Sequence, residues 1–150
     1  MLALVLILLQ TSLPAQPTSQ KVEITADRVE ISQRDGTVSF KGAVTVTRGD
    51  LTLTCETLTG RYKNRRLTSL TAVGHVRVQR GELSASSQRA TYHEADQRLV
   101  LSGAPRVQRG DATLNGQNIT IWLSSEKIVI DKPVGAFDLS ELRPPKQTVQ

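Results

Sequence analysis

The sequence contains few of the residues that most often carry chemistry. It has one cysteine, and aromatic residues make up only 3% of its 150 residues. A single thiol excludes an intramolecular disulfide and a thiolate metal cluster, so we interpret Cys55 as a small core residue. His75 and His93 have no second ligand at metal spacing, so we expect neither a metal nor another cofactor. Scarce rings also argue against nucleic acid, whose bases stack on aromatic side chains.

Catalytic patterns are missing as well. The sequence shows no nucleophile elbow and no paired carboxylates, so an enzyme is the last interpretation we consider. Lys and Arg exceed Asp and Glu by 19 to 14, which gives a net charge of +5. Such an excess attracts polyanions in general, including nucleic acid, anionic lipid and phosphorylated glycolipid. Composition alone does not choose among them.

No apolar run is long enough to span a bilayer. Leu2 to Leu9 is unbroken, but a spanning helix needs about 20 apolar residues. The run fits the core of a secretory signal peptide, with Leu13-Pro14-Ala15 as the cleavage region. We therefore predict a signal peptide at 1–20, with a membrane anchor as the alternative. One β domain at 21–137 and a mobile, polar tail at 138–150 follow.

What the sequence does contain is a repeat. Val44-Thr-Val-Thr-Arg-Gly-Asp50 returns as Val76-Arg-Val-Gln-Arg-Gly-Glu82 and as Pro105-Arg-Val-Gln-Arg-Gly-Asp111, after 32 and 29 residues. An eight-residue unit follows each acid, and another copy opens the domain at 24–31. These copies predict an architecture built from about four repeats of 29–32 residues.

Alternation of apolar residues predicts strands throughout 22–130. A step of three inside each eight-residue unit shifts the parity once, which indicates a bulge or corner. Glycine stands at the centre of the strand before each Arg-Gly corner, at Gly42, Gly74 and Gly103, and indicates a shared bend. The turns are too short for crossover helices, so we predict an all-β fold with an antiparallel sheet.

The segment VEITADRVEISQRDGTVSFKGAVTVTRGDLTLTCETLTGRY resembles the OstA-like family of periplasmic lipopolysaccharide-transport proteins, which includes LptA. The resemblance covers about residues 22–130. It implies a β-jellyroll, an open "β-taco" whose two walls enclose an apolar groove for lipid A acyl chains. It further implies a periplasmic, non-enzymatic protein that passes lipopolysaccharide from the inner to the outer membrane. LptC and the soluble part of LptD share this fold.

On this basis the inward apolar positions are candidate lipid-binding residues. The alternative is that they form an ordinary packed core. They are Ile24, Val29, Ile31, Phe40, Val44, Val46, Leu53, Leu58, Val76, Val78, Leu101, Leu114, Ile119 and Ile121.

Two further features bear on partners. Unpaired edge strands, expected near 22–31 and 127–134, favour a head-to-tail homo-oligomer and edge pairing with LptC-like and LptD-like proteins, unless the chain's ends cap them. Basic residues at one turn, Arg61, Lys63, Arg65 and Arg66, are candidate phosphate contacts, with plain solvation as the alternative.

Other functions stay open at this point. The nearest alternative is an LptC-like component held at the inner membrane. A different class is a structural or adhesive extracellular β-repeat protein, which should have a filled interior and bind no lipid. The lipid register, the true start codon and the number of protomers in a bridge do not follow from the sequence.

Overall fold

The structure, a computed structural model, describes residues 21–135, and this part consists of strands joined by tight turns. The predicted signal peptide and tail lie outside the described residues. The strands are β1 Val22–Thr25, β2 Arg28–Ser32, β3 Thr37–Arg48, β4 Leu51–Lys63, β5 Arg66–Arg80, β6 Leu83–His93, β7 Arg98–Ser102, β8 Arg106–Arg109, β9 Ala112–Asn115, β10 Asn118–Trp122 and β11 Lys127–Asp131.

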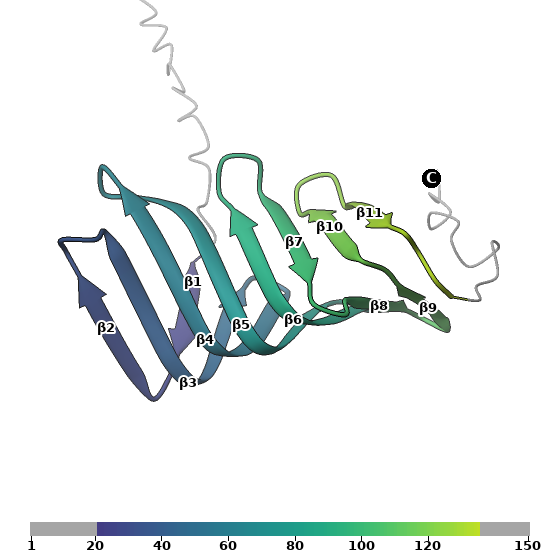
Figure 1. Cartoon of the computed structure of the whole chain (residues 1–150), viewed down its shortest axis with the longest axis horizontal. Coiled ribbons are helices and arrows are strands. Elements are labelled where there is room, and N and C mark those ends of the chain that lie inside the picture. Colours follow the sequence, from purple (N-terminus) through teal and green to yellow (C-terminus); the bar gives the residue numbers. More distant parts are fainter. Residues whose placement is uncertain (1–20, 136–150) are drawn as a thin grey trace, which may run out of the picture.

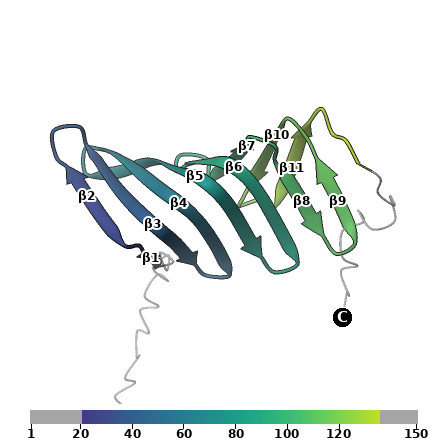
Figure 2. The ribbon, with the colours of Figure 1, turned by 60° about the horizontal axis from the view of Figure 1, so that its bottom comes forward.

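These strands form one open antiparallel sheet, as predicted, which folds over into two walls (Figure 1). The long strands β3 to β6 belong to both walls. The first wall contains β2, β7, β10, β11 and the halves of the long strands that pair with them. The second wall contains β1, β8, β9 and the other halves (Figure 2).

A line of bulges, which we call the spine, separates the two walls. The pairing register shifts between Lys41 and Val44 in β3, and between Val73 and Val76 in β5. Gly42 and Gly74 have φ of +81° and +86° there, and the residue after each also has a positive φ. Two successive residues in this region turn the chain sharply, and glycine adopts it with little strain. The predicted bend at the repeated glycine is therefore confirmed.

The predicted corner in the eight-residue unit is also present. Within β4 the register shifts between Thr54 and Thr57, so this strand bends at the spine. In the copy at 24–31 the same corner separates β1 from β2, and in the last copy it separates β9 from β10. The parity shift thus keeps the apolar side chains of both half-units between the walls.

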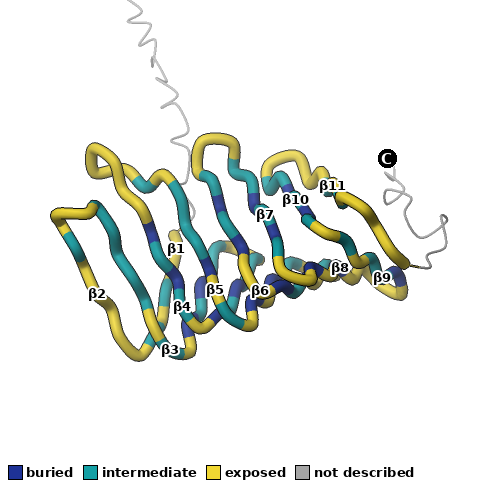
Figure 3. The backbone as a smooth tube through the Cα atoms, in the orientation of Figure 1, coloured by how far each residue is buried: buried dark blue, intermediate teal, exposed yellow. Residues whose placement is uncertain are grey.

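Buried residues are concentrated in the middle of the long strands, on both sides of the spine (Figure 3). Val44 and Val76 of the second wall and Leu58, Leu101 and Ile119 of the first wall are almost inaccessible to solvent. Full burial of such a side chain is worth about 1.5–3 kcal/mol, so this row supplies much of the stability. The side opposite the spine, which we call the mouth, is bordered by the turns at both walls, including the Arg-Gly corners at 48–50, 80–82 and 109–111.

Both ends of the described sheet are strand edges. The first wall ends at β2 and β11, and the second wall ends at β1 and β9. Two backbone hydrogen bonds of 2.8 and 3.1 Å between Asn115 and Val134 cover one end of β9. The edges predicted at 22–31 and 127–134 are therefore edges of this sheet, and β9 adds one that we did not predict.

Candidate functional site

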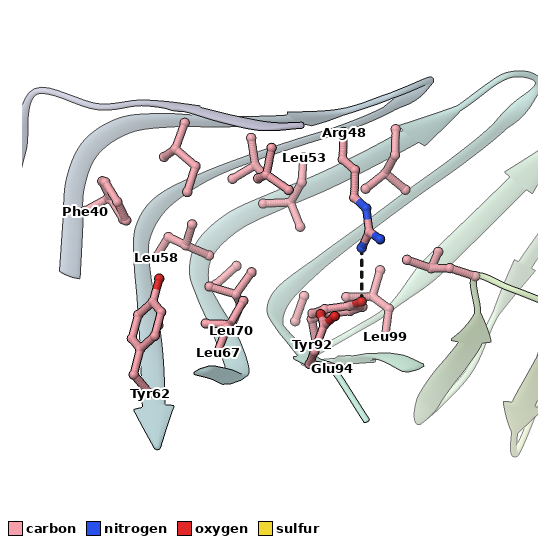
Figure 4. A pocket seen from close by; sticks show the side chains of 18 residues that line it. Phe40, Arg48, Leu53, Leu58, Tyr62, Leu67, Leu70, Tyr92, Glu94 and Leu99 are labelled. Atoms are coloured by element: carbon pink, nitrogen blue, oxygen red, sulfur yellow. Dashed lines mark hydrogen bonds between the residues drawn. The ribbon is translucent and has the colours of Figure 1, made fainter. Parts of the chain in front are cut away.

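An apolar hollow lies between the two walls on the mouth side of the packed spine (Figure 4). Its volume is about 280 Å³, and both walls contribute side chains to it. We call it the first hollow. It is lined by Val22, Ile24, Phe40, Val46, Arg48, Leu51, Leu53, Leu58, Gly60, Tyr62, Leu67, Leu70, Ala72, Ala90, Tyr92, Glu94, Leu99 and Leu123.

The hollow exists because small residues occupy the middle of the first wall. Ala72 and Ala90 are directly opposite each other on β5 and β6, with Leu58 and Leu101 on the outer side of each. Directly paired residues have side chains on the same face. Two methyl groups therefore form the floor where larger side chains would meet the second wall.

Arg48 places a charged group inside this apolar lining. It follows Val44 and Val46 in the inward alternation of β3, and its Nη1 donates a hydrogen bond of 3.1 Å to the hydroxyl oxygen of Tyr92 on the opposite wall. Burial raises the pKa of Tyr92, although the Arg48 contact acts in the other direction. The phenol therefore stays neutral at ordinary pH and remains a hydrogen-bond partner for the guanidinium.

A second arginine crosses the mouth farther along the sheet. Nη1 of Arg80, at the end of β5, donates a 3.1 Å hydrogen bond to the carbonyl oxygen of Leu123. Beyond it lies a second hollow of about 250 Å³ with a mixed lining. Val78, Leu83 and Ile121 are among its apolar residues, and its charged residues are Asp50, Arg80, Glu82, Arg109 and Glu126. The two hollows share Leu51 and Leu123, so they are neighbouring chambers of one interior.

A model of the family described as "LptA/(LptD N-terminal domain) LPS transport protein" matches residues 23–127, almost the whole described sheet. The chain belongs to this family. The resemblance to OstA-like proteins is thereby confirmed, and membership of a transport family agrees with the expectation of a non-enzymatic protein.

A solved structure supports the family's fold in this member. The chain is similar to LptH, described as the LptA homologous periplasmic component of the conserved lipopolysaccharide transport device from Pseudomonas aeruginosa. The TM-score is 0.68 with 23% sequence identity, covering 75% of this chain and 83% of that chain. The likeness shows the LptA-like β-jellyroll. A comparison with curated protein sequences finds no match.

The candidate lipid-binding residues of this LptA-family member fall into four groups. Those lining the first hollow are Ile24, Phe40, Val46, Leu53 and Leu58. Those lining the second are Val78 and Ile121. Those that line neither and are packed beside the spine are Val44, Val76, Leu101 and Ile119. Those on edge strands are Val29 and Ile31, both exposed, and Leu114, half-buried.

More than half of the residues that line the first hollow were not among the candidates chosen from the sequence. Leu51 and Leu70 follow the same inward alternation as residues that we did select, so their parity was a usable signal. Arg48 also occupies an inward position, and a charge at such a place is a stronger signal of function than another leucine. Tyr92 is its partner only because β6 lies opposite β3 across the interior, which no local pattern reveals.

The basic residues predicted as phosphate contacts lie away from both hollows. Arg61, Lys63, Arg65 and Arg66 are exposed at and beside the β4–β5 turn, and none of them lines the first or second hollow. Whether they meet phosphate stays a prediction.

Cys55, Glu56 and His75 line neither hollow. Cys55 is buried, as predicted, and burial raises its thiol pKa to about 11, so the thiol is unreactive at neutral pH. His75 pairs with Glu56 at 2.7 Å on the outside of the spine. Within residues 21–135, no three His, Cys, Asp or Glu side chains are grouped to hold a metal ion. The same part has no helix suited to crossing a membrane.

Proposed function

We propose that this protein is a periplasmic lipopolysaccharide carrier that holds acyl chains between its two walls. The observation that carries this proposal is the apolar interior on the mouth side of a filled spine, in a chain that belongs to a lipopolysaccharide-transport family. A structural or adhesive β-repeat has no use for such a hollow. Export by the predicted signal peptide is part of the proposal.

The lining favours hydrocarbon over a small polar ligand. Most residues that line the first hollow are aliphatic, with Phe40 as an apolar ring, and its ionisable side chains are Arg48, Tyr62, Tyr92 and Glu94. Burial of one methylene is worth about 0.8 kcal/mol, so a dozen carbons gain on the order of 10 kcal/mol before ordering costs. No catalytic group is needed, because the energy for directional transport comes from another component.

The strand edges support a head-to-tail bridge. Joining β11 of one protomer to β2 of the next extends the first wall, and joining β9 to β1 extends the second. Contact between unlike edges propagates without closing, and it makes the interiors continuous. LptC-like and LptD-like proteins with the same edges would join the ends of this bridge in the same way.

Exposed apolar side chains on these edges fit that role. Ile31 on β2 is 69% exposed, although its pairing with Val38 places it on the inward face. Val129 on β11, at the opposite end of the first wall, is also exposed, but its pairing with Thr120 places it on the outer face. The change Ile31→Asp is expected to shift concentrated protein from oligomers to monomer in light scattering, whereas Thr45→Asp, on the outer face, should not.

The nearest alternative is an LptC-like protein anchored in the inner membrane by residues 1–20. The intact mass of the protein recovered from the periplasmic fraction decides between them. A mature chain that lacks the apolar run supports the carrier, and retention of that run in the membrane fraction supports the anchored form.

Lipid binding itself is tested by placing an amide in the hollow. The side chain of Leu70 lines the first hollow, and Thr71 beside it has the opposite orientation in β5. Because an unpaired buried amide costs about 1–3 kcal/mol, Leu70→Gln should weaken lipopolysaccharide binding about 5- to 150-fold, as measured by displacement of a fluorescent fatty acid. Thr71→Gln serves as the matched control. Equal affinities in both variants would contradict the proposal.

A further inference from the structure

Two arginines at corresponding repeat positions meet at one place in the mouth. Arg48 ends β3 and Arg80 ends β5, and each is the arginine of an Arg-Gly corner. Both guanidinium groups line a small hollow of about 90 Å³, together with Asp50, Leu51, Gln97 and Leu123. We call this place the junction.

The junction lies between the two hollows, of which the first is apolar and the second has apolar residues and charged residues in its lining. Arg48, Leu51 and Leu123 also line the first hollow, whereas Asp50, Arg80 and Leu51 also line the second. A molecule with several hydrocarbon chains and one compact polar group would place its chains in the chambers on both sides and its polar group at the junction.

The arginines there have donors to spare. Each guanidinium carries five N–H groups, and the side-chain hydrogen bond of Arg48 within residues 21–135 goes to the neutral oxygen of Tyr92. Within the same residues no carboxylate oxygen lies within 4 Å of the Arg48 guanidinium, so Arg48 forms no direct ion pair there.

Carboxylates also face the junction, and they must be displaced by an anion. Asp50 lies 3.3 Å from Nε of Arg80, and Glu126 lies 3.9 Å from its Nη2. Both acids are largely exposed, with side-chain accessibilities of 70% and 78%, so these ion pairs are weak and free to open. Glu94 is close to Tyr92 and acts on its pKa, but it forms no ion pair with Arg48.

We propose that the junction binds the phosphate of a lipid whose acyl chains occupy the two chambers. The paired N–H groups of an arginine match the oxygens of a phosphate, and two arginines from different strands reach different oxygens of one tetrahedral group. The phosphate replaces Tyr92 and the Leu123 carbonyl as acceptor, and Gln97, which lines the same small hollow, carries an amide N–H₂ group of the type that donates to phosphate. This site rests on the proposed function, because the chains supply most of the affinity.

The junction is a better phosphate site than the basic turn after β4. Arg61, Lys63, Arg65 and Arg66 are surrounded by water, which weakens their attraction for an anion. Arg48 and Arg80 lie against apolar side chains, where the same charges act more strongly. Both arginines occupy the same position of the sequence repeat. The turn after each strand uses the glycine that follows, with its positive φ, and does not require an inward arginine.

The test compares phosphorylated lipid A with enzymatically dephosphorylated lipid A on the full mature chain. Binding is measured by displacement of a fluorescent fatty acid from wild type, Arg48→Gln, and the double variant Arg48→Gln/Arg80→Gln. Arg77→Gln is the matched control, because Arg77 is exposed on the outer face of the strand that carries Arg80. Wild type and Arg77→Gln should prefer the phosphorylated lipid at least tenfold, and the double variant should lose that preference while still binding the dephosphorylated lipid.

Several results would overturn the site. Equal affinity of wild type for both lipids, or an unchanged preference in the double variant, would show that the junction does not bind the phosphate. Neither result would contradict the carrier function. Displacement of the probe by inorganic phosphate at the lipid's concentration assigns the arginines to free phosphate instead. If neither lipid binds to wild type, both the carrier function and the phosphate site at the junction are contradicted. Urea unfolding of each variant shows whether it is folded, and Arg48→Gln alone should show an intermediate preference if the double variant is not.

Discussion

Replacing Gly74 by alanine tests whether the close approach of β4 and β5 at the spine fixes the bend. Gly74 has a φ of +86°, and an added Cβ would lie 2.7 Å from Cδ and 2.9 Å from Cβ of Glu56 on β4. A left-handed backbone costs a non-glycine residue about 1–2 kcal/mol. Because the Cβ of Glu56 is fixed to the backbone of β4, that strand must shift to make room for the extra methyl, at a further cost of about 1–3 kcal/mol. Gly74→Ala should therefore lower the free energy of unfolding by about 2–5 kcal/mol, a large part of the stability of a typical domain.

Gly81 supplies the matched comparison. It has a φ of +57° at the β5–β6 turn, and a Cβ built there meets no atom within 4 Å. Gly81→Ala should thus show only the backbone cost of about 1–2 kcal/mol. The difference between the two variants measures the crowding against Glu56.

Urea unfolding followed by circular dichroism measures both free energies. The double variant Gly74→Ala/Glu56→Ala should recover part of the loss, because it removes the carboxylate and Cδ from the contact. Equal losses at Gly74 and Gly81, or no loss at Gly74, would refute the idea that close approach at the spine fixes the bend.

Other predictions concern single side chains. Leu58→Ala should destabilise the fold by about 2–5 kcal/mol, whereas Ile31→Ala should change stability by no more than about 0.5 kcal/mol in the monomer, both in urea unfolding. Tyr92→Phe should cost about 0.5–1.5 kcal/mol, because it removes the acceptor of Arg48. Burial raises the pKa of Cys55 from 9.0 to about 11, so the stability from its neutral thiol is present below pH 9.0 and is lost as the pH rises through 11. Melting temperatures of Cys55→Ala should fall less steeply than wild type over that window.

The sequence predicted the spine well because its signals are local. A parity shift inside one eight-residue unit and a glycine such as Gly42 or Gly74 at the centre of a strand both report on a few neighbouring residues. The bend, the antiparallel pairing and the Arg-Gly turns follow from those residues alone. Family membership then agreed with the resemblance that the same segment carried.

The boundary between core and hollow did not follow from the pattern. Val76 and Leu53 have the same inward parity, yet Val76 is packed against the spine while Leu53 lines the first hollow. What separates them is distance from the spine and the size of residues on the opposite wall, such as Ala90. These quantities depend on contacts between strands far apart in the sequence. The same reason explains why the partner of Arg48 was not predicted.

The burial of residues on edge strands was also not predictable from the apolar pattern. Val29 and Ile31 alternate like core residues, but they are 52% and 69% exposed because no strand of the described part covers the end of the sheet. Their apolar character fits continuation of the wall by another molecule. An alternating apolar pattern therefore predicts which face of an edge strand is inward, but it does not predict that the face is buried within one chain.

Whether lipopolysaccharide lies between the two walls can be measured by site-specific photo-crosslinking in living cells. A photoreactive amino acid at Phe40 reports on the first hollow and one at Ile121 on the second, whereas Thr45 and Thr120 have the outward parity of the same strands, β3 and β10. If the lipid is held between the walls, we expect lipopolysaccharide adducts at Phe40 and Ile121 and few at the two threonines. Adducts at Thr45 and Thr120 alone would show that the lipid does not enter the space between the walls.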